Sequence, residues 1–153
     1  MKTIDDLKHI HIFTDLNDSE LESLLSFSKL EQYDSGKRIF AEKSNATNLY
    51  GVLEGHVEIR TSGNAGKGDI IIDTARPGQI FGWSAVTEPN TFTAAAWTTE
   101  PTRVISINGQ YLKNLFKTNN HIGYRVMMQI PSVISKRLRQ MRENLAECLQ
   151  ADK

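Results

Sequence analysis

The feature that most constrains the fold is the spacing of glycine and proline through the middle of the chain. Between Glu31 and Asn108 these residues recur every few positions, at Gly36, Gly51, Gly55, Gly63, Gly66, Gly68, Pro77, Gly78, Gly82 and Pro89. The clearest run between them is Tyr50 to Thr61, where Val57 and Ile59 alternate with polar residues. Short runs of this kind, separated by turn residues, are typical of a β-sandwich or β-barrel.

Three more runs in this region predict strands. They are Arg38–Phe40, Asp69–Thr74 and Arg103–Ile107. The glycine cluster from Gly63 to Gly68 predicts the tip of a hairpin, because glycine accepts the backbone angles of tight turns.

The two ends of the chain have a different, helical pattern. Asn17 followed by Glu20 three residues later predicts a capping box that opens a helix. The apolar residues after it recur at helical spacing, at Leu21, Leu24, Leu25, Phe27 and Leu30. From Gly109 to Gln150 turn residues are scarce and a heptad-like stripe appears, made of Tyr124, Met127, Ile134, Leu138, Met141, Leu145 and Cys148.

The long carboxyl-terminal helix carries two further expectations. We expect it to restart or kink at Pro131, since proline removes a helical hydrogen bond. The stripe predicts a homodimer through this helix, with an interface made of Ile134, Leu138, Met141 and Leu145. The basic residues beside the stripe, Arg137, Arg139 and Arg142, are expected to form its solvated flank.

These patterns predict a single domain over the 153 residues, mainly β with flanking helices. We expect a helical cap at 1–30, an antiparallel double-sheet barrel of the jelly-roll type at 31–108, and carboxyl-terminal helices at 109–150. No domain-sized segment would follow the last helix, so no DNA-binding domain is expected.

Composition and charge argue against several other classes of protein. Lysine plus arginine and aspartate plus glutamate are equal at 18 each, and a DNA-binding protein usually has a basic excess. One cysteine, Cys148, allows no internal disulfide. The first residues contain no apolar run long enough for a signal peptide or a membrane span, so we expect a cytoplasmic protein. Four scattered histidines predict no metal site.

Four segments of the chain together resemble one known family. The segments are Ile12–Leu16, Tyr33–Phe40, Leu49–Ile59 and Arg76–Gly82, and the third is the most specific. It has an aromatic residue, a glycine five positions later and alternating aliphatic residues after that. The resemblance is to the cyclic nucleotide-binding domain of catabolite-activator-type regulators, kinase regulatory subunits and gated channels. It implies that the helix from about His121 is the dimerisation helix.

The resemblance also implies a phosphate-binding cassette that begins at Gly82. In the family a short helix starts at this glycine, and its free N–H groups favour an anion. A glutamate then holds the ribose and an arginine about ten residues later pairs with the phosphate. This sequence has Trp83 in place of the glutamate and Phe92 in place of the arginine. The ligand-binding residues implied are Gly82, Trp83, Ser84, Ala85, Phe92, Thr93, Ala94 and, at the base-binding end, Arg142.

Two interpretations of the aromatic replacements stay open. Trp83 and Phe92 either form a pocket for a different ligand or fill the space of a lost nucleotide. A catalytic serine at Ser84 is not expected, because the surrounding segment lacks the second glycine of a nucleophile elbow.

The function predicted from these features is a regulatory sensor module and not an enzyme. It would need no cofactor, and would bind a small anion or a nucleotide, though not cyclic AMP in the standard way. The alternative is a protein-interaction domain with a closed pocket and a protein partner. A deep open pocket at 82–93 would support sensing.

Overall fold

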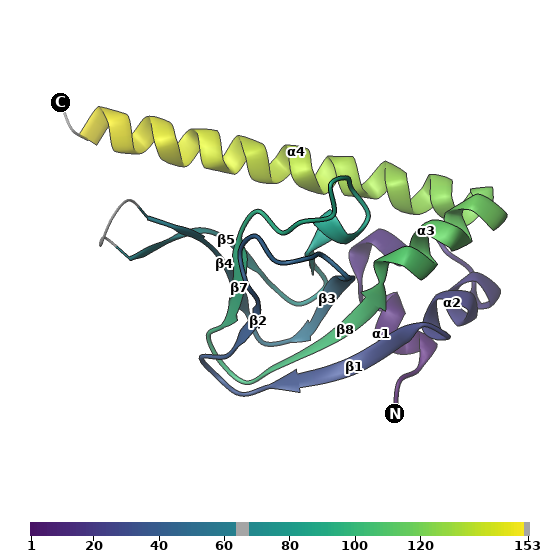
Figure 1. The fold of residues 1–153 in the computed structure, drawn as a ribbon. Helices are drawn as coiled ribbons and strands as arrows, with labels where there is room; N and C mark the ends of the chain where they lie inside the picture. The colour runs from purple at the N-terminus through teal and green to yellow at the C-terminus, as the bar shows by residue number, and fades with distance from the viewer. Residues whose placement is uncertain (64–67, 152–153) are drawn as a thin grey trace.

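The computed structural model describes residues 1–63 and 68–151, and their core is a pair of antiparallel sheets with helices at both ends (Figure 1). One sheet has the strand order β1-β8-β3-β6 and the other has the order β2-β7-β4-β5. The strands are β1 Ser28–Tyr33, β2 Arg38–Phe40, β3 Asn48–Glu54, β4 Val57–Ser62, β5 Asp69–Ala75, β6 Ile80–Phe81, β7 Ala95–Thr98 and β8 Thr102–Asn108. The predicted fold class is therefore confirmed.

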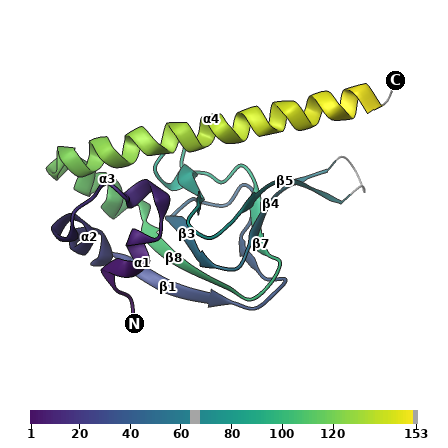
Figure 2. The ribbon, with the colours of Figure 1, turned by 180° about the vertical axis from the view of Figure 1, so that it is seen from behind.

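All the helices except η2 lie toward the two ends of the chain. They are α1 Ile4–Lys8, η1 His11–Phe13, α2 Asp18–Leu25, η2 Trp83–Ala85, α3 Gly109–Thr118 and α4 Asn120–Ala151. The views from front and back show α4 lying along one side of the sheets and extending past them (Figures 1 and 2). The end of α4 that lies past the sheets is the carboxyl-terminal one.

All the predicted strand runs form strands, and the run from Tyr50 to Thr61 forms two. Strands β3 and β4 are separated by Gly55, which has a φ of 90°, a conformation that favours glycine. Three strands were not predicted. Strand β1 lies partly inside the expected helical cap, β6 has only two residues, and the alanine-rich β7 depends on its two neighbours, β2 and β4, for pairing.

The predicted hairpin tip at Gly63–Gly68 can be checked only in its flanks. Strands β4 and β5 pair from Val57 with Ala75 to Ser62 with Asp69. Residues 64–67 themselves lie outside the described residues.

The capping box is confirmed. The Asn17 side chain accepts a hydrogen bond from the Glu20 backbone N–H at 2.9 Å, and the Glu20 carboxylate accepts one from the Asn17 N–H at 2.9 Å. These two bonds satisfy two donors that the start of α2 would otherwise leave without partners.

Of the two outcomes expected at Pro131, a restart or a kink, the restart is wrong, because α4 runs unbroken from Asn120 to Ala151. Pro131 is exposed, so its ring meets solvent rather than a neighbouring element. The apolar side chains of Ile130, Val133 and Ile134 pack on the same cluster on both sides of it. These contacts hold the helix across the one hydrogen bond that proline removes.

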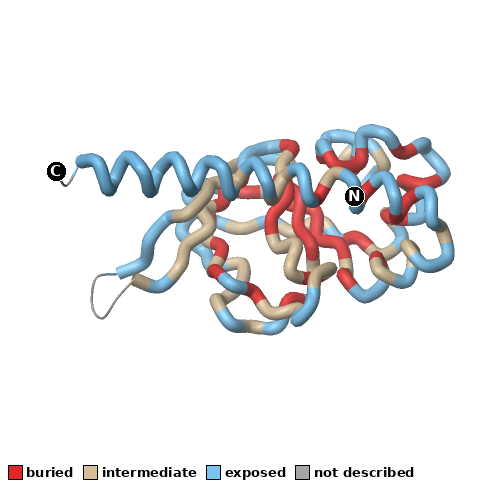
Figure 3. Tube along the Cα trace, turned by 90° about the horizontal axis from the view of Figure 1, so that it is seen from above, coloured by how far each residue is buried: buried red, intermediate tan, exposed pale blue. Residues whose placement is uncertain are grey.

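Two apolar clusters make up the core. The larger one joins α1, η1, α2, α3 and the first half of α4 to the sheet that contains β3 and β8. The smaller one lies between the two sheets. Figure 3 shows the buried residues gathered in the body and the carboxyl-terminal part of α4 exposed along its whole length. No helix among the described residues combines the length and the apolar character needed to span a membrane.

Candidate functional site

A glycine in the left-handed conformation opens the candidate site directly after β6. Gly82 has a φ of 77° and a ψ of 28°, where other residues are strained. A Cβ at this position would lie 3.1 Å from Tyr50 Cδ2 and 3.2 Å from the Asn48 carbonyl oxygen. Both constraints favour glycine, and they allow η2 to start immediately after the strand.

The loop after η2 is fixed by hydrogen bonds. The Asn90 side chain donates to the Ser84 carbonyl at 2.9 Å, which ties the loop to η2. The Phe92 N–H donates to the Ser44 carbonyl at 2.9 Å, and the Lys43 N–H donates to the Phe92 carbonyl at 2.8 Å. Trp83, Phe92 and their neighbours are therefore held in a defined arrangement before any ligand binds.

Aromatic rings fill much of the space between the two sheets. Phe92 is buried and stacks on Phe40, with ring centroids 3.6 Å apart and planes 8° apart. Tyr50 stacks on Phe81 with centroids 4.9 Å apart. Phe92, which stands where the resemblance expects an arginine, is therefore part of the packed interior.

A cavity of about 270 Å³ remains between this aromatic cluster and α4. Its lining is mostly apolar and comes from both sheets, from η2 with the loop after it, and from α4. The lining residues are Phe40, Ile59, Ile72, Asp73, Phe81, Gly82, Trp83, Ser84, Phe92, Thr93, Ala94, Ile134, Arg137, Leu138 and Met141. Phe92 therefore fills part of the expected pocket at 82–93, and the rest of that pocket stays open between Phe92 and α4.

One cation, Arg137, reaches into this cavity from α4. Its guanidinium lies 4.6 Å from the centre of the Trp83 ring, a cation–π contact. Its Nε lies 2.5 Å from Asp73 Oδ2, and its Nη2 donates to the Ile80 carbonyl at 2.6 Å. Burial lowers the pKa of Arg137 and Asp73 opposes that shift, and an arginine stays charged at neutral pH.

The remaining donor of this arginine is not used. Arg137 Nη1 is buried and has no hydrogen-bond partner among the described residues. A buried donor without a partner costs free energy, so an acceptor on a bound molecule would relieve that cost. An arginine on α4 therefore supplies a positive charge that the cassette itself lacks.

Most of the residues predicted for ligand binding line the cavity, and two do not. Ala85 is buried in the inter-sheet cluster below it. Arg142 is exposed and is absent from the lining. Arg142 follows Arg137 by five positions, which places it about 140° around the helix and away from the cavity.

The residues predicted for a dimer interface divide in the same way. Ile134, Leu138 and Met141 line the cavity, yet Leu138 and Met141 are 55% and 41% exposed. Leu145 is 60% exposed and lies beyond the cavity. One stripe of the helix therefore covers the cavity and also presents apolar surface.

Sequence reasoning missed Arg137 and Asp73 as site residues. Arg137 follows Ile134 by three residues and precedes Met141 by four, and this spacing was a signal that the three share one face of the helix. No comparable signal marked Asp73, because β5 meets the cavity only through the packing of the two sheets.

The histidines are scattered, and the described residues contain no group of three metal-binding side chains. His9 and His11 are exposed. His56 Nδ1 lies 2.5 Å from Glu100 Oε1. His121, at the start of α4, belongs to a polar network that fixes the helix.

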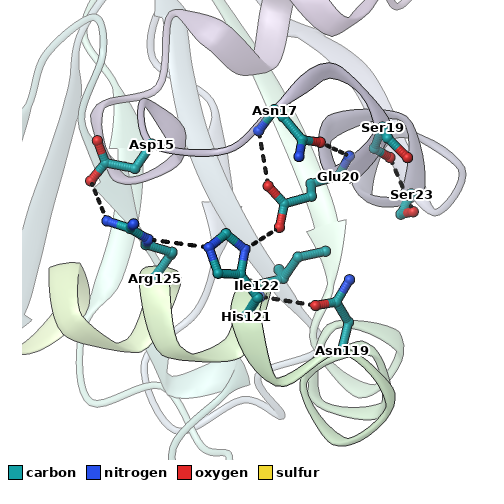
Figure 4. A network of polar contacts seen from close by, with 9 residues as sticks. All are labelled: Asp15, Asn17, Ser19, Glu20, Ser23, Asn119, His121, Ile122 and Arg125. Atoms are coloured by element: carbon teal, nitrogen blue, oxygen red, sulfur yellow. Dashed lines mark hydrogen bonds and ion pairs between the residues drawn. The ribbon is translucent and has the colours of Figure 1, made fainter.

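That network joins the amino-terminal cap to the start of α4 (Figure 4). His121 Nδ1 lies 2.5 Å from Glu20 Oε2, and Arg125 Nε donates to His121 Nε2 at 3.5 Å. Arg125 also pairs with Asp15 at 3.8 Å. Burial raises the pKa of Glu20, but the Asn17 N–H and His121 outweigh it and hold that pKa below its ordinary value of 4.5.

Comparison with known proteins places this geometry in one family. The sequence model of the family described as "Cyclic nucleotide-binding domain" matches residues 30–119, more than half of the chain. A protein of known structure from Geobacter metallireducens GS-15, described as a cyclic nucleotide-binding protein, is 31% identical. That alignment covers 90% of this chain and 99% of the other, with a TM-score of 0.79.

A more distant relative of known structure shares the fold, and another relative is matched by sequence. A cyclic nucleotide-binding domain from Methylobacillus flagellatus has a TM-score of 0.81 at 17% identity, covering 94% of this chain and 83% of that one. A CRP-like cAMP-activated global transcriptional regulator of Mycobacterium tuberculosis is 23% identical over 141 residues, covering 92% of this chain. The chain spans 61% of the length of that curated relative.

Proposed function

This chain belongs to the cyclic nucleotide-binding domain family, and from that premise we propose that it is a ligand-sensing regulatory domain. Its ligand is a small molecule with an apolar body and one anionic group, bound in the cavity beneath α4. No catalytic step is part of this function.

The observation that carries the proposal is the cavity itself, with Arg137 as the one cation among the described residues that line it. The apolar walls favour burial of apolar ligand surface. The Arg137 guanidinium, with its unused Nη1, offers a charge-assisted hydrogen bond to a carboxylate or phosphate oxygen. Asp73 competes for the same guanidinium, so the anionic group must be placed well to be bound.

Cyclic AMP bound in the standard way fits this site poorly. Trp83 and Phe92 replace the two charged groups that the family resemblance implies. Each charge-assisted hydrogen bond contributes about 1.5–3 kcal/mol, so their loss corresponds to about a hundredfold or more in affinity.

Binding of a ligand in the cavity would change the position of α4. Ile134, Arg137, Leu138 and Met141 line the cavity from this helix, so a ligand that contacts them changes the relative stability of positions of α4.

We propose that the exposed residues Leu138, Met141 and Leu145 pair with those of a second copy. A Leu145→Asp variant should then sediment as a monomer at concentrations where the parent is a dimer, and a monomeric parent would contradict the pairing.

The test of the ligand proposal uses Trp83 as its reporter. The chain has two tryptophans, so a Trp97→Phe variant leaves Trp83 alone beside Arg137. Benzoate, octanoate, cyclic AMP and cyclic GMP are titrated while fluorescence and melting temperature are followed, because a ligand of the native state raises that temperature. We expect a carboxylate to bind more tightly than either cyclic nucleotide.

A matched pair of variants identifies the group responsible. Arg137→Met should weaken carboxylate binding by about tenfold or more, the value of one charge-assisted bond. Arg139→Met removes an exposed charge of the same helix and should leave binding unchanged. Tighter binding of cyclic AMP than of the carboxylates, or equal effects of the two variants, would overturn the proposal.

The packing of Phe92 against Phe40 favours a second candidate function, a protein-interaction domain with a closed pocket. In that case none of the four probes would change the Trp83 signal.

A further inference from the structure

A second cavity, of about 640 Å³, lies on the opposite flank of α4 from the first. We call it the basic groove. Its walls are α4, strand β5, the turn between β5 and β6, and η1. The residues that matter for its chemistry are Arg76 and Gln79 of the turn, His11 of η1, and Lys136, Arg137 and Gln140 of α4.

The lining of the basic groove has a clear excess of positive charge. It contains three permanent cations, Arg76, Lys136 and Arg137, and a single carboxylate, Asp73. Asp73 is already paired with Arg137. This excess stands out in a chain whose formal net charge is zero. Like charges that face one concave surface concentrate a positive field there.

Helical spacing explains why one flank of α4 is polar and the other is apolar. Lys136, Gln140 and Asn144 recur every four residues and lie over the basic groove. Ile134, Leu138 and Met141 recur on the neighbouring strip and lie over the apolar cavity. Arg137 lies between the two strips and lines both spaces. The helix thus presents a polar strip to one cavity and an apolar strip to the other.

The wall opposite Lys136 is held rigidly. In the turn, the Gln79 N–H donates to the Arg76 carbonyl at 2.9 Å, and the Arg76 N–H donates to Gln79 Oε1 at 2.9 Å. The His11 N–H donates to the Gly78 carbonyl at 2.9 Å, which ties η1 to the same turn. An arginine from a fixed turn and a lysine from a helix therefore face one space from two sides.

We propose that the basic groove binds the phosphate group of a small molecule. A phosphate dianion has several acceptor oxygens, and these match two cations on separate walls together with the amide donors of Gln140 and Asn144. A carboxylate has one charge and two acceptor oxygens, whereas a phosphate has a charge of up to about −2 and three acceptor oxygens, which suits two facing cations and two amides better. The proposal rests on Arg76 and Lys136, which line the basic groove and not the apolar cavity, and it does not depend on the function proposed for that cavity.

The test is a titration of the full chain with two probes, inorganic phosphate and AMP, followed by NMR. Both should shift the amide signals of Gly78, Gln79 and Lys136. Free phosphate as the natural ligand predicts equal affinities, whereas an organic phosphate predicts tighter binding of AMP. Signals that move instead at 83–94 would place the anion in the apolar cavity and overturn the proposal.

Matched double variants complete the test. Arg76→Gln with Lys136→Gln should weaken binding of both probes by about tenfold or more, because both facing charges are lost. Arg139→Gln with Arg142→Gln removes two exposed charges that lie outside the groove lining, and should change affinity by less than about twofold. Absence of binding to the parent chain, or equal losses in the two double variants, would overturn the proposal.

Discussion

The two halves of α4 carry similar apolar spacing and have opposite surroundings. In the first half Ile122, Val126 and Ile130 recur every four residues and are at most 1% exposed. In the second half Leu138 and Leu145 are 55% and 60% exposed. The difference teaches that a helical stripe identifies a helix but not what covers it.

The reason lies in the elements that surround each half. The first half packs on α3 and η1 and shares the larger apolar cluster with them. The polar network of Glu20, His121 and Arg125 adds a second attachment at its start. The second half passes over the cavity and then extends beyond the sheets (Figures 1 and 3). We interpret the first half as part of the folding core and the second as the functional surface.

The largest effect should come from Ile130→Ala in the first half. This change removes a side chain that is 1% exposed and leaves a void in the core. We expect the free energy of unfolding to fall by about 2–5 kcal/mol, measured by urea denaturation. A loss below about 1 kcal/mol would show that this half is not firmly packed.

The effect of the proline between the two halves of α4 on stability can be tested with Pro131→Ala. Alanine restores a backbone donor and has a much higher helix propensity. Since Pro131 is exposed, no packing is lost, and we expect a gain of about 1–3 kcal/mol in the free energy of unfolding. A destabilised variant would mean that α4 needs the proline where it crosses onto the cavity.

Weakening the polar network at the start of α4 should lower the free energy of unfolding by a smaller amount. Glu20→Gln weakens charge-assisted bonds to Asn17 and His121, and we expect a loss of about 1–2 kcal/mol at pH 7. Because the folded pKa of Glu20 lies below 4.5, this stabilisation is complete above that pH and is lost as pH falls through the folded value. Unfolding curves of parent and variant should therefore converge in acid, and a gap independent of pH would contradict this role.

The smallest effect should come from Leu145→Ala in the second half. Its side chain is 60% exposed, so the stability of a single copy should change by less than about 0.5 kcal/mol. The unfolding measurement is made at a protein concentration below that of self-association, with Ile130→Ala as the comparison. Similar losses in the two variants would remove the distinction between the halves.

The same distinction explains which features could be predicted from the sequence. Turn glycines and alternating runs depend on local chain geometry, so most strands, the capping box of Asn17 and the long helix were predictable. Strand β7 and the pairing of Arg137 with Asp73 depend on packing between distant segments, so no local pattern marked them. The basic groove lies in the same category, because η1, the β5–β6 turn and α4 meet only in the folded chain.

Hydrogen–deuterium exchange along α4 tests the central claim most directly, because exchange rates report local opening. In dilute protein we expect strong protection from Ile122 to Ile134 and weak protection beyond Arg142. Protection of the second half should rise with protein concentration as copies pair. Uniform protection along the whole helix at the lowest concentration would contradict the account.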